Sequence, residues 1–210
     1  TCALPICYKI KSCLKHIENY VRFFQSTDSC KHFSLFALAP QPLLIKLGAL
    51  LTDKIEVETY QLHREPKGWF WQDCTDDFEY IINRPQNMDG KPALVLSLSD
   101  NVSHERITRV IGPDTSIWEV TIKQPHNDFM KSKQQLSLFR KCIRKLIVEI
   151  KNTHGDATPL QIFPVMPVSC AVELGRARMP KADMPWLIYD HDIKTQQFVM
   201  AVELRGDLHQ

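Results

Sequence analysis

The sequence is poor in glycine, and its seven cysteines form no C-x-x-C pair. Cysteine pairs at that spacing are typical of zinc and redox sites, so their absence argues against both and favours reduced thiols in a cytoplasmic protein. The 7 glycines form neither a G-x-x-x-x-G-K phosphate loop nor a G-x-S-x-G elbow, which argues against ATP hydrolysis and acyl transfer. No apolar run approaches the roughly 20 residues of a membrane-spanning helix. We therefore expect no metal, no cofactor and no membrane association.

The chain also lacks a strong net charge. Its 26 Lys and Arg residues exceed its 24 Asp and Glu residues by only 2. A long duplex-DNA surface needs a strongly basic field, so we expect no direct DNA binding, and an anionic ligand must meet a local basic cluster. The first residue is Thr1 rather than Met, from which we expect a domain taken from a longer polypeptide.

One segment occurs twice. Residues 35–48 recur as residues 162–175, with Phe, Pro, Leu and Gly identical at four of the fourteen places. Apolar residues at helical spacing precede each copy, namely Ile10, Leu14, Ile17, Val21 and Phe24 before the first and Leu136, Phe139, Ile143, Leu146 and Ile150 before the second. Each copy therefore predicts helix, strand, turn and helix. The last helix of each is expected to end near Gly48 or Gly175, because glycine suits a left-handed C-terminal position.

Further strands alternate with helices. Apolar or alternating runs predict strands at residues 55–62, 93–98, 117–122 and 186–189, and Ser103 is expected to cap a helix over residues 103–111. This order predicts an α/β fold with a mainly parallel sheet in each half. We expect a single domain over residues 1–210, whose halves, about 1–125 and 126–210, are related by a pseudo-twofold axis.

The loops that follow the predicted strands are the candidate ligand site. In open parallel sheets, ligands bind at the carboxyl ends of strands, beside helix amino termini. The corresponding loops are residues 39–42, 97–101, 123–127 and 166–169. The first and last are expected to face one another across a shared groove, which would suit a quasi-symmetric ligand such as a cyclic nucleotide.

Two groups of side chains have alternative interpretations. Trp69 and Trp71 share one face of an extended segment, where they either stack on bases or fill the core. Arg176, Arg178 and Lys181 follow Gly175, where they either balance phosphates or form a solvated surface.

Short polar residues at a strand end are equally ambiguous. Ser97, Ser99 and Asn101 can donate to a ligand, and they are also common turn formers. The complete set of candidate ligand-binding residues is Pro40, Gln41, Trp69, Trp71, Ser97, Ser99, Asn101, Gln124, His126, Met166, Pro167, Ser169, Arg176 and Tyr189. No catalytic residue is assigned among them.

The ordered series of these segments resembles the SAVED domain, the cyclic-oligonucleotide sensor of bacterial CBASS antiphage effectors. The resemblance rests on residues 33–40 (FSLFALAP), Leu47-Gly48 and the Trp69/Trp71 pair. Above all it rests on residues 162–176 (IFPVMPVSCAVELGR), followed by residues 179–183 and 188–190. It covers nearly the whole chain, from about residue 30 to residue 192.

This resemblance implies two fused CARF-like halves derived from the Rossmann fold, with a pocket for a cyclic di- or trinucleotide made by a CD-NTase. It implies self-association on ligand binding and activation of a fused DNA endonuclease in antiphage defence, the effector lying outside this chain. Bases are expected to stack on Trp69 or Trp71 and on Tyr189, while helix amino termini near Pro40 and Pro167 receive phosphates.

Two other functions remain open. In a ring nuclease that cleaves its own messenger, His126 would be the acid or base, although it also fits a loop histidine beside a helix cap at Asn127 or Asp128. The third interpretation is an interaction module without a small ligand. Intact recovery of the nucleotide after incubation distinguishes a sensor from a ring nuclease.

Overall fold

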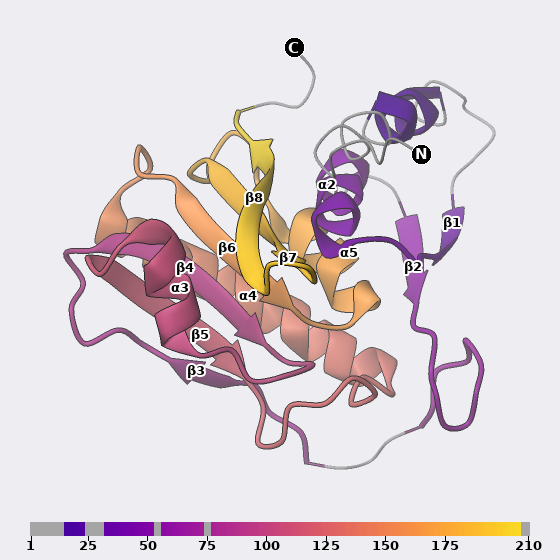
Figure 1. The fold of residues 1–210 in the computed structure, drawn as a ribbon. Helices are drawn as coiled ribbons and strands as arrows, with labels where there is room; N and C mark the ends of the chain where they lie inside the picture. Colours follow the sequence, from indigo (N-terminus) through magenta and orange to yellow (C-terminus); the bar gives the residue numbers. More distant parts are fainter. Residues whose placement is uncertain (1–14, 24–31, 53–55, 74–76, 207–210) are drawn as a thin grey trace.

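A six-stranded sheet with helices on both faces forms the main body of the protein (Figure 1). The computed structural model describes residues 15–23, 32–52, 56–73 and 77–206. The strand order is β3-β5-β4-β6-β7-β8. The strands are β3 (Ile81–Asn83), β4 (Lys91–Ser97), β5 (Thr115–Thr121), β6 (Leu160–Val165), β7 (Trp186–Asp192) and β8 (Gln197–Leu204).

The four inner strands of this sheet run parallel, and the two edge strands are antiparallel to their neighbours. The predicted α/β fold with a mainly parallel sheet is therefore confirmed. The edge strands were not predicted, because β3 has only three residues and the register of β7 and β8 shifts between Ile188 and Tyr189. That irregularity interrupts the alternation of buried and exposed residues from which a strand is recognised.

The central strand β4 is buried on both faces. Ala93 and Val95 belong to an apolar cluster with Ile107 of α3 (His104–Ile111), whereas Leu94 and Leu96 belong to the larger cluster with α4 (Lys133–His154). The two helices therefore cover opposite faces, which explains why β4 is a continuous apolar run.

The caps of these two helices differ. Ser132 accepts from Gln135 N at 3.2 Å, and the Gln135 side chain accepts in return from Ser132 N at 3.0 Å, so α4 begins with a capping box. The helix continues to Gly155, whose φ of 79° only glycine adopts readily. Ser103 precedes α3 as predicted, but its side chain makes no capping bond in the structure.

A second, two-stranded parallel sheet pairs β1 (His32–Phe36) with β2 (Glu56–Tyr60). The helix α2 (Gln41–Leu51) connects these strands, just as α5 (Val168–Ala177) connects the parallel pair β6 and β7. Both copies of the duplicated segment thus form strand, helix and strand, as predicted. The six-stranded sheet takes strands from both sides of residue 125, so where the two halves divide stays a prediction.

The helix predicted ahead of the first copy lies partly within the described residues. Residues 15–23 are helical, and Val21 is buried against Leu50 and Leu51. Ile10, Leu14 and Phe24 lie outside the described residues.

The two helices end near Gly48 and Gly175 as predicted, at Leu51 and Ala177, but the prediction that these glycines occupy left-handed C-terminal positions is wrong. Both lie inside helices, and each faces the backbone of the other helix. A Cβ on Gly48 would stand 2.0 Å from Val172 O, and a Cβ on Gly175 would stand 2.0 Å from Ile45 O. Glycine is therefore needed here for close packing of α2 against α5.

Candidate ligand cavity

The carboxyl ends of several strands meet around a cavity of about 440 Å³. Its walls come from the segments that follow β1, β2, β4, β5 and β6, including the first residue of α5. The lining residues are Leu38, Gln61, Leu62, His63, Arg64, Lys67, Ser99, Asn127, Met166, Pro167 and Val168. The volume falls within the range of about 300–1,000 Å³ that is usual for small-molecule sites.

The cavity lies where α2 and α5 begin. Gln41 Nε2, in the first turn of α2, donates to Met166 O at 3.0 Å, which joins the loops that follow β1 and β6. The first turn of α5 is tied to the segment after β2, because Ser169 N and Oγ donate to Gln61 Oε1 at 3.2 and 2.9 Å. Neither helix carries an acidic residue in its first turn, so the positive end of each helix dipole is not neutralised there.

A short hairpin forms one side of the cavity. His63 N donates to Gly68 O at 2.8 Å, and the residues between them include Arg64 and Lys67, both exposed. The His63 ring is 1% exposed and stands edge-on to Trp71, with ring centroids 5.8 Å apart. Burial lowers the pKa of His63, and the nearby Lys131 ammonium lowers it further, against a smaller opposing effect of Asp128.

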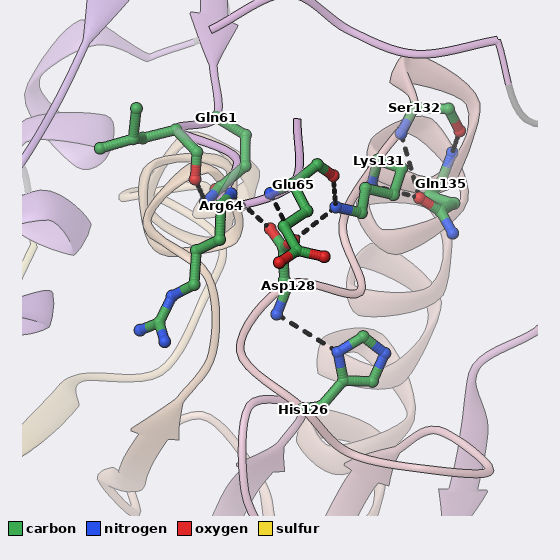
Figure 2. A network of polar contacts seen from close by, with 9 residues as sticks. Gln61, Arg64, Glu65, His126, Asp128, Lys131, Ser132 and Gln135 are labelled. Carbon is green, nitrogen blue, oxygen red and sulfur yellow. Dashed lines mark hydrogen bonds and ion pairs between the residues drawn. The ribbon is translucent and has the colours of Figure 1, made fainter. Parts of the chain in front are cut away.

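Asp128 holds this hairpin against the segment that precedes α4 (Figure 2). Its carboxylate accepts from Arg64 N at 3.1 Å, from Glu65 N at 3.3 Å and from the Lys131 ammonium. Lys131 also donates to Glu65 O at 2.8 Å. Burial alone would raise the pKa of Asp128, but these donors bring it below its ordinary value, so the carboxylate stays ionised and keeps its bonds.

The side chains that line the cavity are cationic or uncharged. Arg64 and Lys67 supply two positive charges, and no Asp or Glu is among the described lining residues. The neighbouring cavity of about 510 Å³ differs in this respect, because Asp77, Glu79 and Asp128 are part of its lining. The 440 Å³ cavity is therefore the better match for an anionic ligand.

Comparison with known families identifies the chain. A family model described as "SMODS-associated and fused to various effectors sensor domain" (SAVED) matches residues 17–204. The chain belongs to the SAVED family. A comparison with curated proteins gave no match.

The SAVED domain is also similar in fold to solved receptors. A SAVED/CARF-domain containing receptor, Cap4 of Acinetobacter baumannii, was solved with the cyclic trinucleotide 2'3'3'-cAAA and is 12% identical, with a TM-score of 0.69. The same receptor with 3'3'3'-cAAA is 14% identical at a TM-score of 0.69. Cap4 of Moraxella osloensis is 13% identical at a TM-score of 0.60. The matches cover 93–96% of this chain but only 42–45% of the receptors, so the SAVED domain spans less than half of their length.

Several predicted site residues of the SAVED domain do lie at this cavity. Ser99, Met166 and Pro167 line it. Gln41 and Ser169 bond to lining residues, as described above. Pro40 is exposed at the N-cap of α2. The bond from Gln41 to Met166 joins the first and last of the predicted loops, whereas their facing one another across a shared ligand groove stays a prediction.

Other predicted residues lie elsewhere. Ser97 is 1% exposed and donates to Glu119 Oε1 at 2.7 Å, inside the sheet. Asn101 is exposed in the loop before α3. Gln124 and His126 line the neighbouring cavity of about 510 Å³.

Neither predicted tryptophan lines the 440 Å³ cavity. Trp69 meets Phe36 edge-on, with centroids 5.3 Å apart, and Phe36 stacks on Tyr60 at 4.4 Å. Trp71 packs against the main core and stands edge-on to the cavity residue His63. Trp71 therefore packs in the core, which is one of its two predicted roles, whereas stacking of a base on Trp69 stays a prediction.

The predicted phosphate cluster is not at the cavity. Arg176 lies in the last turn of α5, at the opposite end from the cavity, and donates to Val57 O at 3.2 Å. Arg178 is 3% exposed, donates to Leu204 O at 3.4 Å and lies over the Trp186 ring. These two arginines hold neighbouring elements together. Lys181 is exposed in the turn that precedes β7.

Tyr189 is also a core residue. Its ring stacks on Phe163 with centroids 4.4 Å apart, and its hydroxyl donates to Gln161 Oε1 at 2.8 Å. Burial raises the pKa of Tyr189, so the hydroxyl stays protonated and keeps this bond. The structure does not offer this ring to a base.

Sequence reasoning missed the residues after β2. All four follow β2, which ends at Tyr60: they are Gln61, His63, Arg64 and Lys67. The predicted strand 55–62 included Gln61, and the strand-end rule that selected the other loops applies to the three residues after it. Asp128 was considered only as a helix cap, whereas its carboxylate bonds to residues about 63 positions away. Only tertiary structure could reveal that contact.

Two kinds of feature are absent from the described residues. Among the residues that the structure places, no group of three or more His, Cys, Asp or Glu side chains could hold a metal ion. No helix within the same residues has the length and apolar character of a membrane span.

Proposed function

We propose that this SAVED domain is a receptor for a cyclic trinucleotide and that the cavity at the start of α5 is its binding site. The observation that carries the proposal is a strand-end cavity with Arg64 and Lys67 in its lining and no carboxylate among its described residues. A cyclic trinucleotide carries three phosphate charges, which such a site attracts. The similarity in fold to Cap4, solved with cyclic trinucleotides, supports the choice of ligand.

The two halves are proposed to be related by a pseudo-twofold axis that passes between α2 and α5. The reciprocal glycine contacts support this, because Gly48 faces Val172 and Gly175 faces Ile45, and the same offset of 127 positions relates both pairs. Each helix begins at the cavity, so the ligand would touch both halves. Binding would then be coupled to how the halves pack.

The fused effector and the assembled state belong to the same proposal. The chain spans less than half of the Cap4 receptors, so an attached nuclease and self-association on binding would complete the function. In this scheme, a CD-NTase makes the ligand, and the SAVED domain binds it without cleaving it. His126 lies in the neighbouring cavity and accepts from Asp128 N at 3.3 Å, so no observation favours the ring-nuclease alternative.

Titration calorimetry with cyclic trinucleotides tests the receptor function. We expect the wild-type domain to bind at least one ring, and the double substitution Arg64→Gln, Lys67→Gln to weaken binding about tenfold, as expected for loss of charge-assisted contacts. Lys194→Gln is the matched control, because Lys194 is exposed in the turn after β7 and lines none of the cavities described. Absence of binding to every ring would refute the receptor function, and equal losses in both variants would refute the site.

Two further measurements separate the alternatives. Chromatography of the nucleotide after incubation should return it intact, whereas linear products would indicate a ring nuclease. Size-exclusion chromatography with light scattering should show a larger species when the ligand is added. An unchanged mass at saturating ligand would contradict self-association and leave binding standing.

A further inference from the structure

His63 is a buried polar residue without hydrogen-bond partners on its ring. It is 1% exposed, and neither Nδ1 nor Nε2 has a partner in the structure. Buried polar atoms are nearly always paired in folded proteins, and an unpaired one therefore needs an explanation. His63 also lines the 440 Å³ cavity, so a ligand in that cavity is a candidate partner for its ring.

The surroundings of His63 hold its ring in one place. Its backbone is bridged to Gly68, and its ring stands edge-on to Trp71 at 5.8 Å with an interplanar angle of 72°. Asp128 and Lys131 anchor the hairpin from the other side, through Arg64 N and Glu65 O. An imidazole that is already oriented loses little freedom when it binds, which favours a recognition role.

The cationic side chains of the cavity are exposed, whereas several of its uncharged side chains are buried. Arg64 and Lys67 are exposed, whereas His63, Met166 and Pro167 are buried. Phosphates, which retain water readily, fit beside the exposed cations. We therefore assign the phosphates to the exposed cations and a nucleobase to the side of the cavity lined by buried residues, since contacts to phosphates position a nucleic acid and contacts to bases specify it.

The protonation of His63 agrees with contact to a base. The groups that face it are Lys131 and Asp128, and burial together with Lys131 lowers its pKa. The ring is therefore neutral at pH 7, with one nitrogen that donates and one that accepts. Nucleobase edges present both acceptors and donors, so a neutral imidazole can distinguish one base from another.

Building on the receptor function, we propose that His63 hydrogen-bonds the nucleobase that enters the cavity and thereby determines which base the SAVED domain prefers. Arg64 and Lys67 then attract any cyclic trinucleotide, whatever its bases. Affinity and base preference are thus assigned to different residues of the same hairpin.

The test compares His63→Phe with the wild-type protein on the cyclic trinucleotides of adenosine, guanosine and uridine. Phenylalanine keeps an aromatic ring against Trp71 and removes both nitrogens. We expect the ratio of dissociation constants between the least and most preferred rings to fall about tenfold, the effect of one lost hydrogen bond that leaves a partner unpaired. The control Arg64→Gln should weaken all three rings by a similar factor and leave the ratio unchanged.

A measurement on the unaltered protein covers the case in which His63→Phe does not fold. The ¹⁵N resonances of the His63 ring, followed by NMR at pH 7, should move when the preferred ring is added, because hydrogen bonding changes the nitrogen shielding. Resonances that stay in place, or an undiminished ratio in a folded His63→Phe, would overturn the role of His63 while the receptor function stands. Failure of the wild-type protein to bind any ring would overturn both.

Discussion

Alanine at Gly175 is the sharpest structural test, because the contact that it would disrupt is so short. The new Cβ would lie 2.0 Å from Ile45 O and 2.7 Å from Ala49 N, both backbone atoms of α2. Real Cβ atoms essentially never come closer than 3.0 Å, so the helices must separate by at least about 1 Å. Backbone cannot rotate away as a side chain can, and the separation must therefore spread along α2 and α5.

Two effects set the size of the destabilisation. Overpacking a core typically costs about 1–3 kcal/mol, and a clash between backbones falls at the upper end. Alanine recovers about 1 kcal/mol of helix propensity over glycine, which offsets part of that loss. We expect Gly175→Ala to lower the free energy of unfolding by about 2 kcal/mol, or the melting temperature by about 4–8 °C for a domain of this size.

Thermal unfolding followed by circular dichroism measures this directly. Gly68→Ala is the matched control, because a Cβ there meets nothing within 4 Å and its φ is not positive. The control should melt within about 1 °C of the wild type or slightly above it, since alanine restricts the unfolded chain. The double substitution Gly48→Ala, Gly175→Ala should lower the free energy of unfolding by less than the sum of the two single substitutions, because one separation of α2 from α5 relieves both close contacts. A Gly175→Ala protein as stable as the control would refute the close crossing of the helices.

Three more outcomes are expected. Glu173 is 1% exposed and its carboxylate lies 2.7 Å from Arg140 Nη2. Glu173→Gln should therefore lower the free energy of unfolding, measured in urea, by about 2 kcal/mol, because it removes one charge of a buried ion pair. A loss below about 0.5 kcal/mol would contradict a stabilising ion pair between Glu173 and Arg140. Burial lowers the pKa of His154, so the unfolded chain takes up more protons below pH 6.5 and the stability of the fold decreases as the pH falls. His154→Gln should make the melting temperature depend less on pH between pH 7 and 5. An unchanged dependence of the melting temperature on pH would contradict this contribution of His154. Trp71→Leu should weaken cyclic trinucleotide binding in calorimetry more than Trp69→Leu does, because the Trp71 ring stands against the cavity residue His63, whereas the Trp69 ring stands against Phe36. A larger loss for Trp69→Leu would contradict this.

The parts of the fold that the sequence predicted have a clear local apolar pattern. The helix through Phe139 and Ile150 was recognisable because its buried residues recur at helical spacing. The strand of the second duplicated segment was recognisable because it is a short, continuous apolar run, which the structure buries almost throughout. The edge strands β3 and β8 lack such a pattern, since each has only one neighbour in the sheet and much of each is exposed. Gly48 and Gly175 were identified as important, but for the wrong reason, because close packing and a left-handed turn both select glycine.

For the site, the rule that ligands bind at strand ends selected Ser99, Met166 and Pro167 correctly as neighbours of one cavity. The same rule cannot say which strand-end side chains point inward. Arg176 and Tyr189 showed this, since the first bonds to Val57 O and the second stacks in the core. Residue type suggests what a side chain can bind, and only packing decides what it does bind.

The sequence by itself determined the α/β class and the two strand-helix-strand units, because periodicity and duplication are local properties that can be recognised without knowledge of distant contacts. Tertiary structure alone decided that His63 is buried beside Trp71 and that Asp128 anchors the hairpin 63–68. These contacts join residues far apart in the chain, and their energies depend on burial and on exact distances that no local pattern records.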